Sequence, residues 1–336
     1  MASYLLKRFI LILPTLLGIS VLCFVLIQFV PGGPVEEMIA KVQATGGNRG
    51  SNTQAISEAE IENIKKYFGF DKPAHERYFV WLGNLLTGDW GRSYVYHKPV
   101  LEVILSKMPI SLFFGLTSFI LAYSISIPLG VIKTLKHNTA FDTWSSSIIF
   151  AGYVIPGFAL GILLIIFFGG GSYLDWFPIS GVVSDHFENL SPWGKTLDFL
   201  HHMCLPLLCF MIGEFAFLTM LTKNSLLEEN RKDYMRTALA KGLSTNVATW
   251  KHALRNAMIP LATGMGEIFT IMFAGSLLIE RVFDIDGMGL LFYNSIVGRD
   301  YNVVLGLIVL ISLFTMLGRL FSDILYVIID PRIRLH

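Results

Sequence analysis

The stretch from Lys223 to Met258 reads KNSLLEENRKDYMRTALAKGLSTNVATWKHALRNAM, and it joins two long apolar runs of the chain, 203–221 and 259–279. Two segments in it have helical patterning, 233–241 and 245–256. Gly242 separates them, and Ser244 is placed to cap the second. Seven Lys and Arg against three acids give the stretch a net charge of +4. It therefore predicts a pair of short polar helices held between two membrane spans.

The apolar runs are frequent and long along the rest of the chain. A spanning helix needs about 20 mostly apolar residues, because its own backbone must satisfy every hydrogen bond in lipid. Of 336 residues, 53% are hydrophobic and only 15% are charged, against roughly 25% charged in soluble domains. Six runs are long enough: 9–30, 110–132, 145–168, 203–221, 259–279 and 304–324. We predict an all-α integral membrane protein with six transmembrane helices.

The basic residues of the short loops predict the orientation. Lys and Arg are enriched in short loops on the cytoplasmic side. With the N-terminus inside, thirteen fall in cytoplasmic segments, and the short outer loops hold only Lys195, Arg281 and Arg299. The long segment 31–109 does not count, since long loops cross largely regardless of charge. Both termini and the loop 223–258 are therefore predicted to be cytoplasmic.

The segment 31–109 is too long to be a mere connection. Helical patterning is present at 57–68, before Gly69, and at 74–86, before Thr87-Gly88-Asp89. We predict three parts: the N-terminus with the first span (1–30), a helical periplasmic insertion (31–109), and a core of five spans (110–336). A loosely ordered insertion stays open as the alternative.

No set of residues for catalysis or metal binding is recognised in the sequence. Gly194-Lys195-Thr196 lacks the first glycine of a phosphate-binding loop, and His75-Glu76 lacks the second histidine of a zinc protease. The cysteines lie in apolar runs, without the spacing of a metal site or a disulfide framework: Cys23, Cys204 and Cys209. We expect a chain that is not an enzyme and binds no metal or cofactor.

Ionisable residues inside the predicted spans need a reason, because a carboxylate costs a few kcal/mol there. Glu214 lies in the fourth run and Glu267 in the fifth. One hypothesis is that they line a translocation path and attract ammonium or guanidinium groups of a substrate. The alternative is a hydrogen-bonded packing role. Arg319 and Asp323 lie four apart, and we expect them to form a pair on one helix face.

The loop 223–258 has two functional interpretations. Paired short helices across a turn also occur in DNA-binding proteins, but attachment to membrane spans at both ends makes entry into a DNA groove implausible, so we expect no nucleic-acid partner. A docking surface for a cytoplasmic partner is favoured, and a merely solvated basic loop is the alternative.

The same loop resembles a known family, the permease subunits of ATP-binding-cassette (ABC) importers of the oligopeptide/dipeptide class. The matching residues are Asp233-Tyr-Met-Arg-Thr-Ala-Leu-Ala-Lys-Gly242-Leu-Ser and His252-Ala-Leu-Arg255-Asn256-Ala-Met-Ile-Pro260. Where the family's founding consensus has Glu-Ala-Ala, this chain has Arg236-Thr237-Ala238. Further matches are Pro31-Gly-Gly-Pro34, Glu280-Arg-Val-Phe283, Gly287-Met-Gly289, Arg299-Asp300-Tyr301 and Asp330-Pro331-Arg332-Ile333-Arg334.

Within that class, the chain is most similar to the branch called YejB, associated with uptake of microcin C and other peptides in Gram-negative bacteria. The residues behind this are Gly69-Phe-Asp-Lys-Pro73, His75-Glu-Arg-Tyr-Phe79, Gly170-Gly-Ser-Tyr173 with Asp175, and Thr219-Met-Leu-Thr-Lys-Asn-Ser225.

The resemblance implies an ABC importer type I permease fold in the bacterial inner membrane, moving peptides or peptide conjugates from periplasm to cytoplasm. It implies a second related permease as heterodimer partner, two ATPase domains that hold ATP and Mg, and a periplasmic substrate-binding protein. The implied ATPase-coupling residues are Asp233, Arg236, Thr237, Ala238, Gly242, Ser244, Thr245, Arg255 and Pro260. The implied periplasmic contacts are Glu280, Gly287, Gly289, Arg299 and Asp300. A proton-coupled secondary transporter that uses Glu214 or Glu267 as a relay stays open as the alternative.

Overall fold

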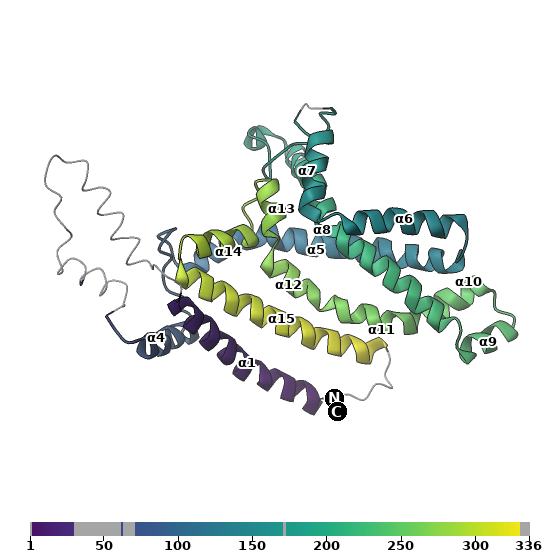
Figure 1. The fold of residues 1–336 in the computed structure, drawn as a ribbon, viewed down its shortest axis with the longest axis horizontal. Helices are drawn as coiled ribbons and strands as arrows, with labels where there is room; N and C mark the ends of the chain where they lie inside the picture. The colour runs from purple at the N-terminus through teal and green to yellow at the C-terminus, as the bar shows by residue number, and fades with distance from the viewer. Residues whose placement is uncertain (1, 30–61, 63–70, 171–172, 330–336) are drawn as a thin grey trace. The chain divides into compact units, whose positions relative to one another are not determined.

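The computed structural model describes residues 2–29, 62, 71–170 and 173–329, and these are mostly helical (Figure 1). The long helices are α1 (Ala2–Phe29), α5 (Val100–Leu135), α8 (Pro192–Glu229) and α15 (Tyr301–Ile329). The shorter ones are α4 (Ala74–Leu86), α6 (Ala140–Val154), α7 (Gly157–Phe168), η1 (Phe187–Asn189), α9 (Asp233–Ala240), α10 (Thr245–Ala248), η2 (Thr249–Ala253), α11 (Leu254–Met265), α12 (Glu267–Ala274), α13 (Leu277–Val282) and α14 (Met288–Val297). The described residues form no sheet, only isolated bridges. The predicted all-α fold is confirmed.

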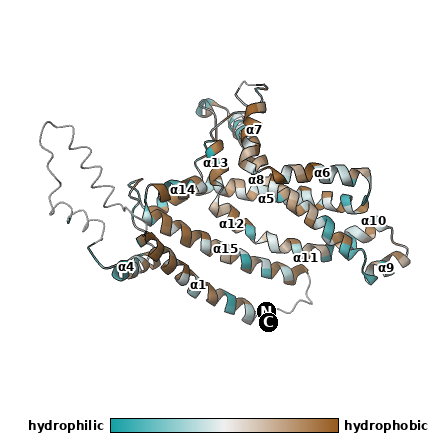
Figure 2. Ribbon diagram, viewed as in Figure 1, coloured by the Kyte–Doolittle hydropathy of each residue, from teal (hydrophilic) through white to brown (hydrophobic). Residues whose placement is uncertain are grey.

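Within the described residues, five helical segments are long and apolar enough to cross a membrane: α1, α5, α8, Thr245–Ala274 and α15. Apolar residues cover most of α1 and α7 in Figure 2. Prolines lie inside four of the five segments without ending them: Pro14, Pro109, Pro128, Pro206 and Pro260. A membrane helix tolerates proline, because neighbouring helices and local adjustments satisfy the freed backbone groups.

The run predicted as the third span, 145–168, is a bent pair of helices. α6 and α7 meet at 100°. Between them Ile155 and Pro156 are extended, with ψ of 118° and 138°. The ring of a proline disfavours helical backbone at the preceding residue, which accounts for the break. Counted as one crossing, the pair brings the number of spans to the predicted six.

The helix that begins after Ser244 is longer than predicted. α10, the π-helical η2, α11 and α12 form one segment, Thr245–Ala274, which counts as a single candidate span. It ends at Gly275, whose φ of +64° leaves the helical region. The predicted boundaries at 256 and 279 are therefore wrong: nothing stops the helix near Asn256, whereas Gly275 ends it before Ile279.

Packing divides the chain into two compact units that cut across the predicted parts. Unit 1 comprises the described residues within 1–10, 108–290 and 314–336, and unit 2 comprises those within 11–107 and 291–313. Unit 2 joins residues 93–95 of the insertion to the start of α15 through Asp300, and the division into 1–30, 31–109 and 110–336 stays a prediction. One core cluster of unit 1 is built on α5, α8, α13 and the chain just after α13: Phe114, Met203, Leu205, Cys209, Ile279, Phe283 and Ile285.

Unit 2 has a small core of its own. Phe24 of α1, Tyr78 of α4 and Leu305 of α15 pack together, and the rings of Phe24 and Tyr78 meet edge to face at 5.3 Å. The hydroxyls of Ser20 and Tyr78 lie 2.9 Å apart. The helix predicted at 74–86 is confirmed as α4. The helix predicted at 57–68 lies outside the described residues except for Glu62, as do the motifs 31–34 and 330–334.

Candidate functional site

The turn between the two short helices of the loop 223–258 has the predicted form. Gly242 follows α9 with φ of +89°, a conformation that side chains with a Cβ rarely adopt. Ser244 is extended and caps α10, its hydroxyl accepting a hydrogen bond from the Val247 amide at 3.5 Å. The expected helix, glycine and N-cap are therefore all present.

One face of this loop is buried against the ends of two spans. Met235 of α9 is 2% exposed and packs with Ala248 and Ala253 on Val131 of α5 and Leu226 of α8. Burial of a side chain such as Met235 contributes about 1.5–3 kcal/mol. The loop is therefore fixed to α5 and α8 by a core of its own.

A buried carboxylate holds the turn between α8 and α9. Glu229 Oε1 lies 2.5 Å from Lys232 Nζ, and Glu229 Oε2 accepts a hydrogen bond of 2.6 Å from the Tyr234 hydroxyl. Burial, and then this hydrogen bond, raise the pKa of Tyr234 to about 12. The phenol therefore stays protonated and donates its hydrogen bond at physiological pH.

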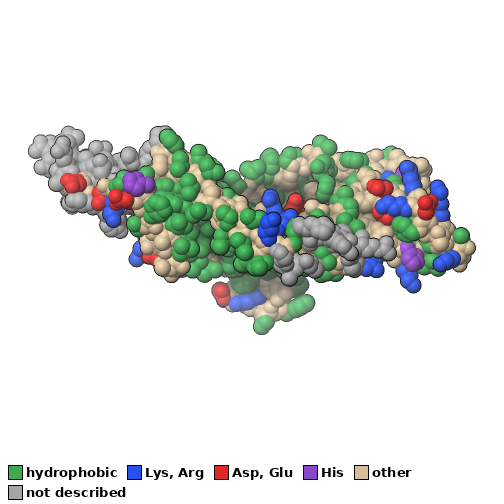
Figure 3. Space-filling model, turned by 90° about the horizontal axis from the view of Figure 1, so that it is seen from below, with side chains coloured by type: hydrophobic (Ala, Val, Ile, Leu, Met, Phe, Trp, Pro, Cys, Tyr) green, Lys and Arg blue, Asp and Glu red, His purple; other side chains and the backbone are tan. Residues whose placement is uncertain are grey.

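The opposite face of the loop is exposed and both basic and apolar. Its large apolar side chains are Leu239, Val247 and Trp250, each between 41% and 46% exposed. Exposed basic residues lie among them in the sequence: Arg236, Lys241 and Lys251. Figure 3 shows charged side chains gathered at the end of unit 1 that α9 and α10 form. An exposed tryptophan and other apolar side chains beside a guanidinium group suit contact with another protein.

The structure brings most of the predicted coupling residues together, on α9, the turn and the start of α10: Asp233, Arg236, Thr237, Ala238, Gly242, Ser244 and Thr245. Asp233 and Arg236 pair at 3.3 Å, but both are exposed, so the pair adds little stability. Arg255 lies further along, on α11, and its Nε donates to the Ile329 carbonyl at 3.2 Å. Pro260 lies on α11 and lines a cavity.

That cavity, of about 390 Å³ within unit 1, contains both predicted intramembrane acids on its wall. Glu214 comes from α8 and Glu267 from the first turn of α12. The rest of the wall is mainly apolar or small: Gly213, Phe217, Leu218, Leu221, Pro260, Leu261, Thr263 and Gly264. The two carboxylates therefore share one space, which can attract a cationic group.

Three of the predicted outer contacts form one buried turn. Glu280 is 1% exposed, and its carboxylate accepts hydrogen bonds from the amides of Ser276 (3.0 Å), Gly289 (3.3 Å) and Leu290 (2.7 Å). A Cβ on Gly287 would lie 2.7 Å from the Glu280 carboxyl carbon. Glu280, Gly287 and Gly289 thus hold the backbone between α13 and α14, and their contact with a partner stays a prediction.

Arg299 and Asp300, the other two, belong to unit 2. Asp300 is buried, accepts from the Ser93 hydroxyl, and accepts from the Val95 amide at 3.2 Å. It therefore ties the start of α15 to residues 93–95 of the insertion. Arg299 has φ of +54°, in the left-handed region.

Sequence reasoning missed a cluster of buried charges. Asp142 at the start of α6 contacts Lys133 of α5 and Lys223 of α8. In the sequence, Lys133 and Lys223 count only among the thirteen basic residues of the predicted cytoplasmic segments. The one local signal is the N-cap, since the Thr139 hydroxyl accepts from the Asp142 amide at 3.5 Å. The π-helical turn η2 was also missed, and no sequence signal for it is apparent.

Comparison with known proteins agrees with the helical architecture. Residues 126–335 match the family described as binding-protein-dependent transport system inner membrane component. The chain is 43% identical to the inner membrane ABC transporter permease protein YejB of Escherichia coli O157:H7, with 99% of each chain covered. It is 40% identical to the peptidoglycan transport system permease protein YejB of Agrobacterium fabrum, covering 99% of this chain and 98% of that one. It is 36% identical to the oligopeptide transport system permease protein AppB of Bacillus subtilis, with 99% of each covered. Five or six candidate spans in the described residues, a helical loop packed on α5 and α8, and relatives matched over nearly their full length agree on one conclusion: this chain belongs to the family of binding-protein-dependent transport system inner membrane components, the permease subunits of ABC importers.

Proposed function

We propose that this chain is a permease subunit of an ATP-driven importer that carries peptides or peptide conjugates from the periplasm to the cytoplasm. Two of the relatives named above are permeases for peptidoglycan and oligopeptide transport, and a further relative, 35% identical, is a dipeptide transport system permease protein of Bacillus subtilis. The observation that carries the proposal is the loop 223–258, exposed on one face and packed on α5 and α8 with the other.

The partner of this loop, in our proposal, is an ATPase subunit that itself holds ATP and Mg²⁺, so that this chain needs no cofactor. The exposed Leu239, Val247 and Trp250 provide apolar area, and the basic residues around them provide orientation. The core around Met235 transmits a displacement of the loop to α5 and α8, because packed interiors shift between discrete arrangements and do not deform freely.

The complete importer, as proposed, contains two ATPase domains, a second related permease and a periplasmic substrate-binding protein. Both termini and the loop 223–258 face the cytoplasm, as the distribution of Lys and Arg predicts. The outer loops around Glu280 and Arg299 then lie on the side from which substrate is delivered.

The proposed translocation path includes the cavity that Glu214 and Glu267 line. Two carboxylates on an otherwise apolar wall favour the passage of groups with positive charge, such as a peptide's α-ammonium. The same two acids would be the relay of a proton-coupled secondary transporter, so the energy source separates the two functions.

The first test is purification of the tagged chain in mild detergent, with ATP hydrolysis measured on what accompanies it. We expect a related permease and an ATPase whose activity changes when Gly242 is replaced. A chain that purifies alone and still moves substrate contradicts the proposal. Uptake that survives ATP depletion but is lost with the proton gradient would favour the secondary transporter.

The substrate is tested in cells that lack the chain, complemented with the wild type or with the Gly242 variant. Microcin C sensitivity and uptake of a labelled oligopeptide and a labelled peptidoglycan fragment are measured side by side. Wild-type complementation that restores microcin C sensitivity supports conjugate transport. Restoration of peptide uptake alone limits the proposal to peptides.

A further inference from the structure

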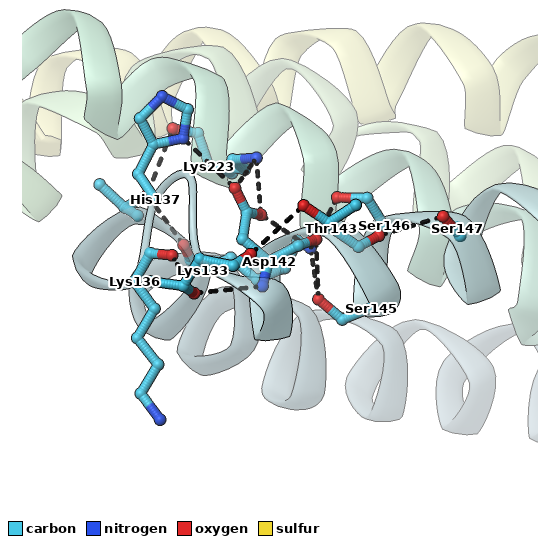
Figure 4. Close-up of polar contacts among 12 residues, drawn as sticks. Lys133, Lys136, His137, Asp142, Thr143, Ser145, Ser146, Ser147 and Lys223 are labelled. Atoms are coloured by element: carbon cyan, nitrogen blue, oxygen red, sulfur yellow. Dashed lines mark hydrogen bonds and ion pairs between the residues drawn. The ribbon is translucent and has the colours of Figure 1, made fainter.

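Three helices of unit 1 meet at a buried cluster of charges, shown in Figure 4. Lys223 of α8 lies 2.7 Å and 2.8 Å from the two carboxylate oxygens of Asp142, and Lys133 of α5 lies 3.1 Å from Oδ1. All three side chains are at most 10% exposed. At the solvent side, His137 Nδ1 lies 3.3 Å from Oδ2.

The two lysines differ in their hydrogen-bond partners among the described residues: Lys133 has several, whereas Lys223 has only the Asp142 carboxylate. Lys133 Nζ also donates to the Asp142 carbonyl (3.1 Å) and to the hydroxyls of Ser145 (2.6 Å) and Ser146 (2.9 Å). Lys223 Nζ donates both of its hydrogen bonds to the Asp142 carboxylate. Removing the charge of Lys223 therefore leaves Asp142 paired with Lys133, and no buried ion is stranded.

The contact with Lys223 is the only ion pair between α6 and α8 in the part of the chain that the structure describes. Further along, residues of both helices line a cavity of about 250 Å³: Ile149, Phe150 and Tyr153 of α6, and Ala216, Phe217, Met220, Leu221 and Asn224 of α8. Near the far end of α6 the two helices touch again, since a Cβ on Gly152 would lie 3.3 Å from Ile212 Cδ1. At the start of α6, the polar contact with α8 is made by Asp142.

The cluster lies directly beside the core that supports the loop 223–258. A Cβ on Gly130 would lie 2.6 Å from Thr222, and the Thr134 hydroxyl donates to the Lys223 carbonyl at 3.3 Å, so α5 and α8 are in close contact here. Close by on these two helices are Val131 and Leu226, on which Met235 packs. A displacement of the loop therefore reaches α8 at the place where α8 binds α6.

We infer that Asp142 is a positioning residue of the transport cycle, which ties α6 to α8 through Lys223 so that movement of the loop 223–258 also moves α6. The inference rests on the proposed function, in which an ATPase acts on that loop. The consequence is specific: breaking the tie lowers the amount of substrate moved for each ATP hydrolysed, while the complex still assembles.

The test uses the complete complex in proteoliposomes and measures peptide transported per ATP hydrolysed. The variant is Lys223→Met, which removes the tie and leaves Asp142 paired with Lys133. Lys223→Arg keeps a cation that can bind the carboxylate in a bidentate manner. Lys136→Met is the matched control, since it removes an exposed lysine from the adjacent turn without touching Asp142. Assembly is measured by size-exclusion chromatography and stability by thermal melting.

We expect the ratio to fall about fivefold or more in Lys223→Met, the lower end of usual coupling between sites, and to stay near the wild-type value in Lys223→Arg and Lys136→Met. An unchanged ratio in assembled Lys223→Met overturns the inference. If Lys223→Met does not assemble, Lys223→Gln replaces it under the same criterion. A wild-type complex without ATP-driven transport would instead reject the proposed function.

Discussion

Arg8 of α1 forms an ion pair with Asp323 of α15, with Nη1 2.5 Å from Oδ2. The Asp323 side chain is 8% exposed, whereas that of Arg8 is 43% exposed. The expected partner of Asp323 was Arg319, one turn away on the same helix. The observed pair instead joins the first residues of unit 1 to its last helix, so the acid serves tertiary packing.

Replacing Arg8 by Gln leaves the Asp323 carboxylate buried without its partner. We expect the free energy of unfolding to fall by about 1–3 kcal/mol, the cost of an unsatisfied buried group. Thermal melting in detergent measures the effect. Lys7→Gln removes the same charge from the adjacent exposed residue and is the control, and equal melting temperatures for the two variants would contradict the role of the pair.

Gly242→Val tests the turn between α9 and α10. A β-branched residue is strained at φ of +89°, although a Cβ there would meet no atom within 4 Å. The strain costs about 1–2 kcal/mol, so we expect the loop to reorient and transport per ATP to fall. Gly242→Asn, which tolerates positive φ better, should retain more activity. Equal transport by both variants would show that the conformation of this residue does not matter.

Glu280→Gln tests the buried turn between α13 and α14. An amide cannot accept all three backbone hydrogen bonds that the carboxylate now accepts, and its NH₂ group meets donors. We expect a loss of about 1–3 kcal/mol in unfolding free energy. Asp284→Asn removes an acid from an exposed position nearby. If both variants melt together with the wild type, Glu280 does not hold the turn.

Gly318→Ala tests the crossing of α12 and α15. A Cβ on Gly318 would overlap the Gly266 carbonyl oxygen and lie 3.3 Å from Phe269 Cβ. Overpacking of this kind costs about 1–3 kcal/mol, and we expect a lower melting temperature. Gly18→Ala is the control, since nothing lies within 4 Å of a Cβ there. If Gly318→Ala melts at or above the temperature of Gly18→Ala, the close approach of α12 and α15 at Gly318 does not contribute to stability.

Replacing Glu214 and Glu267 together by Gln tests the charge of the cavity. If cationic groups pass the carboxylates, uptake of a Lys-containing peptide should fall by about tenfold, corresponding to ~1.4 kcal/mol, and uptake of a neutral analogue should change less. Proteoliposome uptake of the two peptides measures the ratio. Parallel changes for both peptides would remove the pair from the path.

Local signals predicted much of the fold. The Thr87-Gly88 pair marks the end of α4, and Gly242 with Ser244 bounds the two short helices, because each of these residues acts on its own backbone. The presence of each span followed from the length of its apolar run. The effect of a proline inside a run could not be predicted: Pro156 interrupts the helix, whereas Pro128 and Pro206 lie inside continuous helices, and the local sequence does not distinguish the two cases.

The candidate site shows the same division between local features, which the sequence predicts, and contacts between distant residues, which it does not. The loop 223–258 was found from its own residues. Asp142 with Lys223, and Arg8 with Asp323, lie far apart in the chain, and only tertiary packing selects such pairs. Glu280 was singled out by its motif, but its burial and its three backbone bonds depend on the fold of residues 275–290.

The bend between α6 and α7 also bears on how the chain crosses the membrane. At 1.5 Å per residue, helices of 15 and 12 residues each fall short of the roughly 30 Å hydrocarbon layer. Neither helix alone is long enough to cross that layer, so a crossing here needs both helices together. The sidedness of the two ends of the chain depends on this pair: if α6 and α7 make one crossing, both ends lie on the same side of the membrane, and if they make none, the ends lie on opposite sides.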